Sequence, residues 1–118
     1  MKPEEWLERA EKRLTAAQAL FNGGIFEDCL FMVHQAIEVA FKAVILFKTK
    51  KLAPRVHSLQ QLAKLTGFEN TAVFAGLEPV YAGVRYPDAP EVVVSEEEVE
   101  KCLSLAMRVV KWSKSQIK

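Results

Sequence analysis

The sequence predicts an all-α protein, an up-and-down helical bundle of three long helices plus one or two short helices. Long segments repeat apolar residues at spacings of three and four, which is the pattern of one buried helix face. Glycine and proline fall mainly between the long segments, and no stretch alternates like a strand ladder. With 118 residues, of which 50% are hydrophobic and 26% charged, residues 1–118 are expected to form one domain with its own core.

The first two helices are expected over residues 3–21 and about 25–48. Pro3 suits a first helical turn, and the seam of the first helix follows it at residues 7, 10, 14, 17 and 21. Asn22-Gly23-Gly24 ends that helix, because these residues readily adopt a left-handed C-cap. The second segment contains no glycine or proline. The short connection predicts antiparallel packing of the two helices.

The second half of the chain predicts a short helix, a weaker segment and a long final helix. Ser58 can cap a helix that places Leu59, Leu62 and Leu65 on one side and ends at Gly67. Residues 70–84 are interrupted by glycine and proline, which predicts a short or kinked helix, and residues 85–94 are expected to be a loop. The capping box Ser95-Glu96-Glu97-Glu98 opens a helix to about residue 115.

Composition narrows the classes of function and location. Sixteen basic and fifteen acidic residues give a net charge of +1, so no overall basic field favours nonspecific nucleic-acid binding. The longest apolar run, residues 39–47, carries Lys42 and is too short to span a bilayer. The first residues have no apolar signal core, so a cytoplasmic protein is expected.

Cys29 and Cys102 are 73 positions apart in apolar, helix-patterned segments. Zinc sites usually need cysteine or histidine pairs at close spacing, so no metal site is expected. The simplest interpretation is two small buried hydrophobic residues in a reducing compartment. A long-range disulfide or a reactive thiol is the alternative.

His34, Glu38 and Lys42 are spaced i, i+4 and i+8 in the second helix, so they form one polar row beside its apolar face. One interpretation is a solvated stripe with ordinary ion pairing. The other is a row that faces a cleft or a second subunit, where an imidazole and a charge pair could hold a polar ligand.

Two further short segments could bind an anion. His57 precedes a helix start, where it either caps or packs locally or donates to a phosphate at the amide-rich helix end. In Arg85-Tyr86-Pro87-Asp88, the arginine offers a planar fork for phosphate or carboxylate, and the proline extends Tyr86. Asp88 could instead pair with Arg85 as a structural contact.

Together these segments resemble the HEPN domains, named for higher eukaryotes and prokaryotes and for nucleotide binding. The most specific part is residues 34–44, HQAIEVAFKAV, which is similar to the central helix of that family. Residues 56–62, VHSLQQL, resemble its His-x-Leu-x-x-Leu short helix, and residues 85–88 and the capped helix from Ser95 follow in the same order.

The resemblance implies a helical bundle that dimerises, with a polar cleft near the subunit junction and no metal or cofactor beyond a nucleotide ligand such as ATP. It also implies a partner, a minimal nucleotidyltransferase, in a toxin–antitoxin pair or as a substrate-binding subunit. The candidate nucleotide- or phosphate-binding residues that match family segments are His34, Glu38, Lys42, His57, Arg85, Tyr86 and Asp88.

Many HEPN domains are metal-independent ribonucleases, whose motif at the start of the final long helix is an arginine, a polar residue and, after four to six intervening residues, a histidine. Here both histidines precede Arg85, and no histidine follows it. General acid–base cleavage needs a group that titrates near neutral pH, so we expect a noncatalytic nucleotide- or RNA-binding module. The alternatives are a ribonuclease with a rearranged site, and a structural partner-binding dimer whose contact surface is marked by exposed Trp6 or Trp112.

Overall fold

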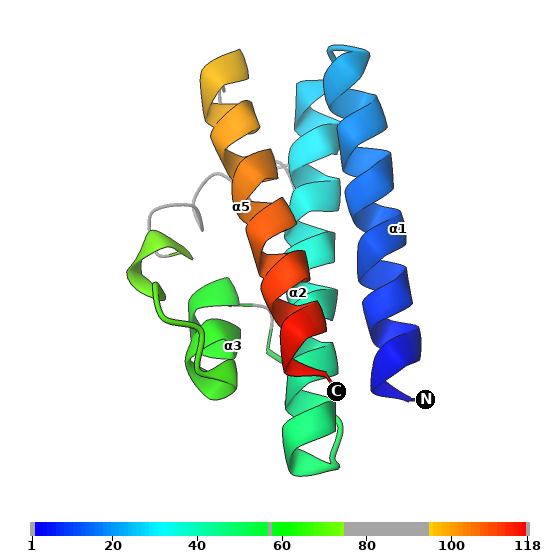
Figure 1. The fold of residues 1–118 in the computed structure, drawn as a ribbon. Helices are drawn as coiled ribbons and strands as arrows, with labels where there is room; N and C mark the ends of the chain where they lie inside the picture. The colour runs from blue at the N-terminus through cyan, green and yellow to red at the C-terminus, as the bar shows by residue number, and fades with distance from the viewer. Residues whose placement is uncertain (1, 57, 75–94, 118) are drawn as a thin grey trace.

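The computed structural model describes residues 2–56, 58–74 and 95–117. Its helices are α1 (Pro3–Asn22), α2 (Phe26–Thr49), α3 (Leu59–Thr66) and α5 (Glu96–Gln116). Figure 1 shows the three long helices side by side, with α3 against the half of α2 nearer its C-terminal end. The described residues contain no strand. The predicted all-α bundle is therefore confirmed, and its long helices begin and end within about two residues of the expected positions.

The turn between α1 and α2 spans residues 23–25 and makes the two helices antiparallel, as predicted (Figure 1). Gly24, with φ 75°, is the left-handed residue. Its N–H donates to the Phe21 carbonyl at 3.0 Å, and the Ile25 N–H donates to the Leu20 carbonyl at 2.9 Å. This pair of hydrogen bonds is a Schellman motif, which satisfies carbonyls that the end of α1 would leave unpaired.

α2 is the central helix, since it packs against α1, α5 and α3. By length and composition it could cross a membrane, but 61% of that stretch is buried inside the bundle. The core helix of a soluble protein passes the same test. Its fully buried side chains form one broad side of the helix: Cys29, Leu30, Val33, Ala36, Ile37, Ala40, Phe41, Ala43 and Val44.

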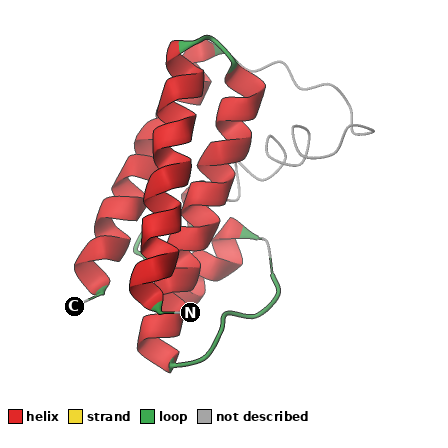
Figure 2. Cartoon of the chain, turned by 90° about the vertical axis from the view of Figure 1, so that its right-hand side faces the viewer, coloured by secondary structure: helices red, strands yellow, loops and turns green. Residues whose placement is uncertain are grey.

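α3 begins at the predicted cap, where the Gln61 N–H donates to Ser58 Oγ at 3.3 Å. Gly67 ends it in the left-handed conformation, with φ 83°. Figure 2 shows the loop that leads from the end of α2 back toward α3. The prediction that Leu59, Leu62 and Leu65 share one side was wrong, because Leu65 is 55% exposed. Steps of three residues turn about 60° short of a full helical revolution each time, so Leu65 has rotated off the buried face.

An aromatic cluster joins α2, the segment after α3, and α5. Phe41 lies 5.6 Å from Phe68 and from Phe74 between ring centroids, and Phe68 lies 5.1 Å from Trp112. Trp6 and Trp112, proposed above as exposed contact residues, are instead half-buried against the core. Such large rings contribute more stability when they pack against other apolar surface.

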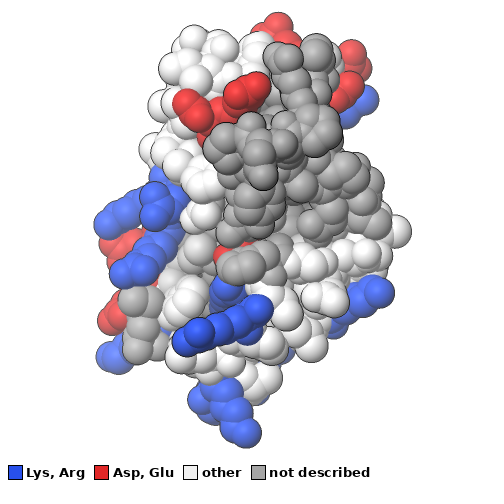
Figure 3. Space-filling model, turned by 180° about the vertical axis from the view of Figure 1, so that it is seen from behind, with Lys and Arg blue, Asp and Glu red and all other residues white. Residues whose placement is uncertain are grey.

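The predicted cap of the final helix is also present, because the Glu98 N–H donates to Ser95 Oγ at 3.1 Å. Glutamates occupy the first turn of α5, and Glu27 and Asp28 occupy the first turn of α2. On the face in Figure 3, acidic side chains gather at the end where α2 and α5 begin, and basic ones gather at the opposite end. This distribution complements the helix dipoles.

The weak segment expected over residues 70–84 is described only as far as Phe74, and residues 72–74 are helical. Phe74 is fully buried, whereas Val73 is 36% exposed. The loop expected over residues 85–94 lies outside the described residues.

Candidate functional site

The polar row on α2 is the first candidate site. Because α2 is continuous through residues 34–42, steps of four residues bring His34, Glu38 and Lys42 onto one side of the helix. The row borders a half-exposed side of α2 that carries Phe31 and Gln35. The sequence therefore predicted the alignment of the row correctly.

Glu38 lies between the other two side chains and contacts both. Lys42 Nζ donates to Glu38 Oε2 at 3.2 Å, and His34 Nδ1 is 3.8 Å from Glu38 Oε1. The side chains of His34, Glu38 and Lys42 are 7%, 11% and 14% exposed. The solvated-stripe interpretation is therefore wrong, because the row is almost entirely removed from water.

The row neutralises much of its own charge. Each carboxylate oxygen of Glu38 faces a nitrogen of a neighbouring residue on the same helix. The Lys42 ammonium has three N–H donors, and Glu38 uses one of them. Lys42 is thus the member of the row with donors left for a ligand anion, and Glu38 is its positioning partner.

The other predicted site residues, His57, Arg85, Tyr86 and Asp88, lie outside the described residues. The expectation that Arg85 and the row meet in one cleft therefore stays a prediction. Within residues 2–56, 58–74 and 95–117, no group of three or more histidine, cysteine, aspartate or glutamate side chains could hold a metal ion.

Cys29 on α2 and Cys102 on α5 are buried, and they do not form a disulfide. Burial, followed by repulsion from Cys102, raises the pKa of the Cys29 thiol to about 11. Because the thiolate is the reactive form, Cys29 is inert near neutral pH. The interpretation of these residues as buried hydrophobic side chains fits this structure, and the reactive-thiol alternative does not fit Cys29.

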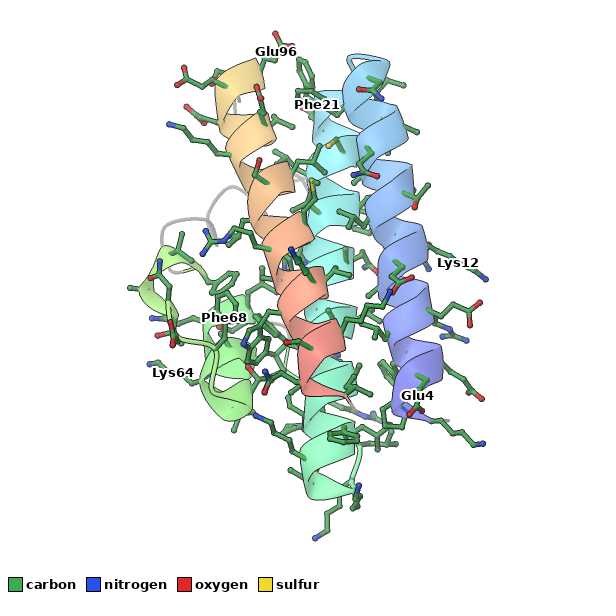
Figure 4. All side chains as sticks on the ribbon, in the orientation of Figure 1. Glu4, Lys12, Phe21, Lys64, Phe68 and Glu96 are labelled. Carbon is green, nitrogen blue, oxygen red and sulfur yellow. The ribbon has the colours of Figure 1, made fainter. Side chains whose placement is uncertain are left out.

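The structure also contains a groove that sequence reasoning missed. This α3–α5 groove has a volume of about 480 Å³, and its lining residues are Phe68, Glu69, Asn70, Arg108, Lys111, Trp112 and Ser115. One wall is the segment that follows α3, and the other is the C-terminal half of α5. Figure 4 shows Phe68 between these two elements.

Arg108 and Lys111 are exposed, and no described residue pairs with either side chain. Other lysines on α5 differ, since Lys101 pairs with Glu97 and Lys114 pairs with Glu11. The groove therefore combines the rings of Phe68 and Trp112 with two cations that have no partner among the described residues.

A helical projection of the final helix could have indicated this groove. Arg108, Lys111 and Trp112 fall on one side, next to the apolar face. Only the tertiary structure supplies the opposite wall, because Phe68 precedes Arg108 by 40 positions in the chain.

Comparison with known proteins gives this bundle a family. The family model described as the HEPN domain matches residues 3–116. The chain belongs to the HEPN family. Its fold is also similar to the crystal structure of an archaeal HEPN homologue, with a TM-score of 0.74 and 27% sequence identity, over 100% of this chain and 99% of that chain.

None of the curated proteins matches this HEPN domain. The membership supports a role connected with nucleotides or RNA. Finer assignments have to come from the residues themselves.

Proposed function

We propose that this HEPN domain is a noncatalytic, dimeric subunit that binds a nucleotide or an RNA end and acts beside a minimal nucleotidyltransferase. The observation that carries this proposal is the buried row of His34, Glu38 and Lys42 in the central helix of a chain that matches the HEPN model over residues 3–116. Lys42 provides donors for phosphate, Arg85 a planar fork, and Tyr86 a ring for stacking.

The histidines support a binding role over catalysis. The chain has two, and neither lies in α5, where the ribonuclease motif of HEPN domains places its histidine. His34 is 6% exposed and faces the Glu38 carboxylate. A general base must reach the hydroxyl from which it takes a proton, and an enclosed imidazole is poorly placed for that.

The half-exposed side of α2 supports dimerisation. Apolar side chains that are only partly covered, Phe31, Met32, Val39 and Leu46, lie on that side. A second copy that packed there would remove them from water, and the hydrophobic effect would favour the association. Because the polar row borders the same side, Lys42 would then lie near the junction of the two subunits.

The proposed partnership with a nucleotidyltransferase rests on the family resemblance. A domain that binds a nucleotide or RNA end without cleaving it can present that ligand to an enzyme that transfers a nucleotidyl group. Expression of the two proteins together followed by size-exclusion chromatography tests this part, and two separate peaks at micromolar concentration would contradict it.

Isothermal titration calorimetry with ATP and with a short 5′-phosphorylated RNA tests the ligand. We expect saturable binding by the wild-type protein, and an affinity at least about tenfold lower for Arg85→Ala, since one charge-assisted contact contributes about 1.5–3 kcal/mol. Arg55→Ala is the matched control, because it removes an arginine that has no place in the proposed site.

Three further outcomes would contradict the proposed function. Absence of binding to both ligands would remove the nucleotide assignment. Loss of RNA in the presence of a chelator, abolished by His57→Ala, would show a ribonuclease with a rearranged site instead. Light scattering should give twice the chain mass, and a monomer at micromolar concentration would contradict the dimer.

A further inference from the structure

We propose that the α3–α5 groove is a second ligand site, which binds one nucleotide unit by its phosphate and its planar ring. None of its lining residues belongs to the polar row of α2 or to residues 85–88. The groove therefore goes beyond the proposed function and does not depend on it.

The phosphate would bind to Arg108 and Lys111. These residues are three positions apart on α5, so their side chains project from adjacent turns of one side of the helix. No described residue pairs with them, so within the described part of the chain their hydrogen-bonding capacity is available for an anion. A guanidinium and an ammonium close together favour phosphate strongly, because each contact is assisted by charge.

The ring would lie against the aromatic part of the groove. Phe68 and Trp112 are 5.1 Å apart between centroids and nearly perpendicular, at 83°. Phe41 supports both rings from α2, at 5.6 Å from Phe68 and 6.3 Å from Trp112. Planar nucleobases stack on aromatic side chains with little dependence on base identity.

The remaining lining groups fit the middle of a nucleotide. The carboxylate of Glu69 and the amide of Asn70 can accept hydrogen bonds from ribose hydroxyls or from an exocyclic amino group. The volume of about 480 Å³ lies within the range of small-molecule sites, about 300–1,000 Å³. The arrangement places cations, hydrogen-bond acceptors and rings together around a space of nucleotide size.

Fluorescence of Trp112 tests the proposal directly. The chain has two tryptophans, so Trp6→Phe leaves Trp112 as the single reporter. We expect saturable quenching by AMP or by a 5′-phosphorylated RNA hexamer, and at least about tenfold weaker binding by adenosine, which carries no phosphate. The unphosphorylated hexamer should bind more weakly than the phosphorylated one, because it keeps its internal phosphodiesters but lacks the more highly charged terminal phosphate. AMP and the hexamer distinguish a free nucleotide from an RNA end.

The double variant Arg108→Ala/Lys111→Ala should weaken that binding at least about tenfold. Its matched control is Lys12→Ala/Arg13→Ala on α1, which removes one lysine and one arginine from exposed positions away from the groove. Figure 4 shows Lys12 pointing away from the bundle.

Two results would each overturn the proposal. One is the absence of saturable Trp112 quenching with both AMP and the phosphorylated hexamer. The other is an equal loss of binding affinity in the two double variants. Quenching of Trp112 reports the groove, whereas heat that depends on Arg85 reports the site under the proposed function. The failure of one site is thus distinguishable from the failure of the other.

Discussion

The polar row of α2 and the α3–α5 groove both contain cations, but these cations differ in their burial and in their ion pairing. In the row, Lys42 is 14% exposed and donates to Glu38 on the same helix. In the groove, Arg108 and Lys111 are exposed, and no described residue pairs with them. Within the described residues, His34 and Lys42 of the row both face Glu38, whereas the groove cations face no acidic partner.

Because of this difference, the ion pair of the row contributes to folding stability, whereas the groove cations contribute little to it. A buried ion pair needs both partners, because removal of one leaves an uncompensated charge in the interior. Exposed cations contribute little to folding and can exchange water for a ligand at small cost. We therefore expect substitutions in the row to affect the free energy of unfolding as well as binding, and substitutions in the groove to affect binding alone.

The largest expected effect is on the aromatic support beneath the groove. Phe41→Ala should lower the free energy of unfolding by about 3–5 kcal/mol, because it deletes a fully buried ring that contacts Phe68, Phe74 and Trp112. Urea denaturation followed by circular dichroism measures the change. Leu65→Ala, at a 55% exposed position, should change stability by less than about 0.5 kcal/mol. Equal losses in the two variants would contradict the assignment of the core.

The next largest effect is expected for Lys42→Met. It should lower the free energy of unfolding by about 3 kcal/mol, because it removes the ammonium partner of the nearly buried Glu38 carboxylate. Lys12→Met is the matched control. Lys12 forms an i,i+4 pair with Glu8 at 3.6 Å, but both side chains are mostly exposed, so we expect a loss below about 0.5 kcal/mol. A comparable cost for the two substitutions in urea denaturation would show that burial of the row does not matter.

The groove variant Arg108→Ala/Lys111→Ala should be close to neutral for folding, within about 0.5 kcal/mol, although it removes two charges. The physical reason is that neither side chain pairs with a described residue. Thermal unfolding of the variant beside the wild type measures this. A loss approaching that of Lys42→Met would mean that the groove cations are structural, and the comparison between the two regions would fail.

The smallest effect concerns the thiol of Cys29, whose pKa is raised to about 11 by burial and by repulsion from Cys102. The folded protein keeps this proton over a pH range in which the unfolded chain loses it, starting near the ordinary thiol pKa of 9.0. The contribution of Cys29 to stability is therefore fully present below pH 9 and is lost as the pH rises toward 11.

Alkylation checks the same property. Reaction of Cys29 with iodoacetamide at pH 8 should be slow in the folded protein and fast in denaturant, because the reagent needs an accessible thiolate. Mass spectrometry of the peptide that contains Cys29 follows the rate. Equal rates in the two conditions would contradict burial of the thiol.

Local signals were sufficient to predict most of the fold. The caps at Ser58 and Ser95 and the glycines at residues 24 and 67 mark helix ends through hydrogen bonds and backbone conformations that span a few residues. Leu65 was assigned wrongly because three-residue spacing drifts around a helix, and the drift matters in a helix of two turns.

The candidate site was less predictable than the fold. Spacing showed that His34, Glu38 and Lys42 align, but the depth of burial depends on packing against other elements, which spacing does not contain. The groove was missed because its two walls, around Phe68 and Trp112, are distant in the chain and meet only after folding. Whether Arg85 approaches the row stays a prediction, since residues 75–94 are outside the described part.

Lys48 connects the two walls of the groove. Its Nζ donates to the Thr66 carbonyl at the end of α3, at 2.9 Å, and lies 5.8 Å from the centre of the Trp112 ring on α5. A hydrogen bond from a charged donor contributes about 1.5–3 kcal/mol, and an exposed cation–π contact contributes about 0.5–1 kcal/mol. The two contacts of Lys48 therefore hold the walls together with a modest interaction energy. A ligand wider than the present opening would have to detach this ammonium group and also separate the Phe68 and Trp112 rings, which lie 5.1 Å apart, so both contacts set the spacing of the walls.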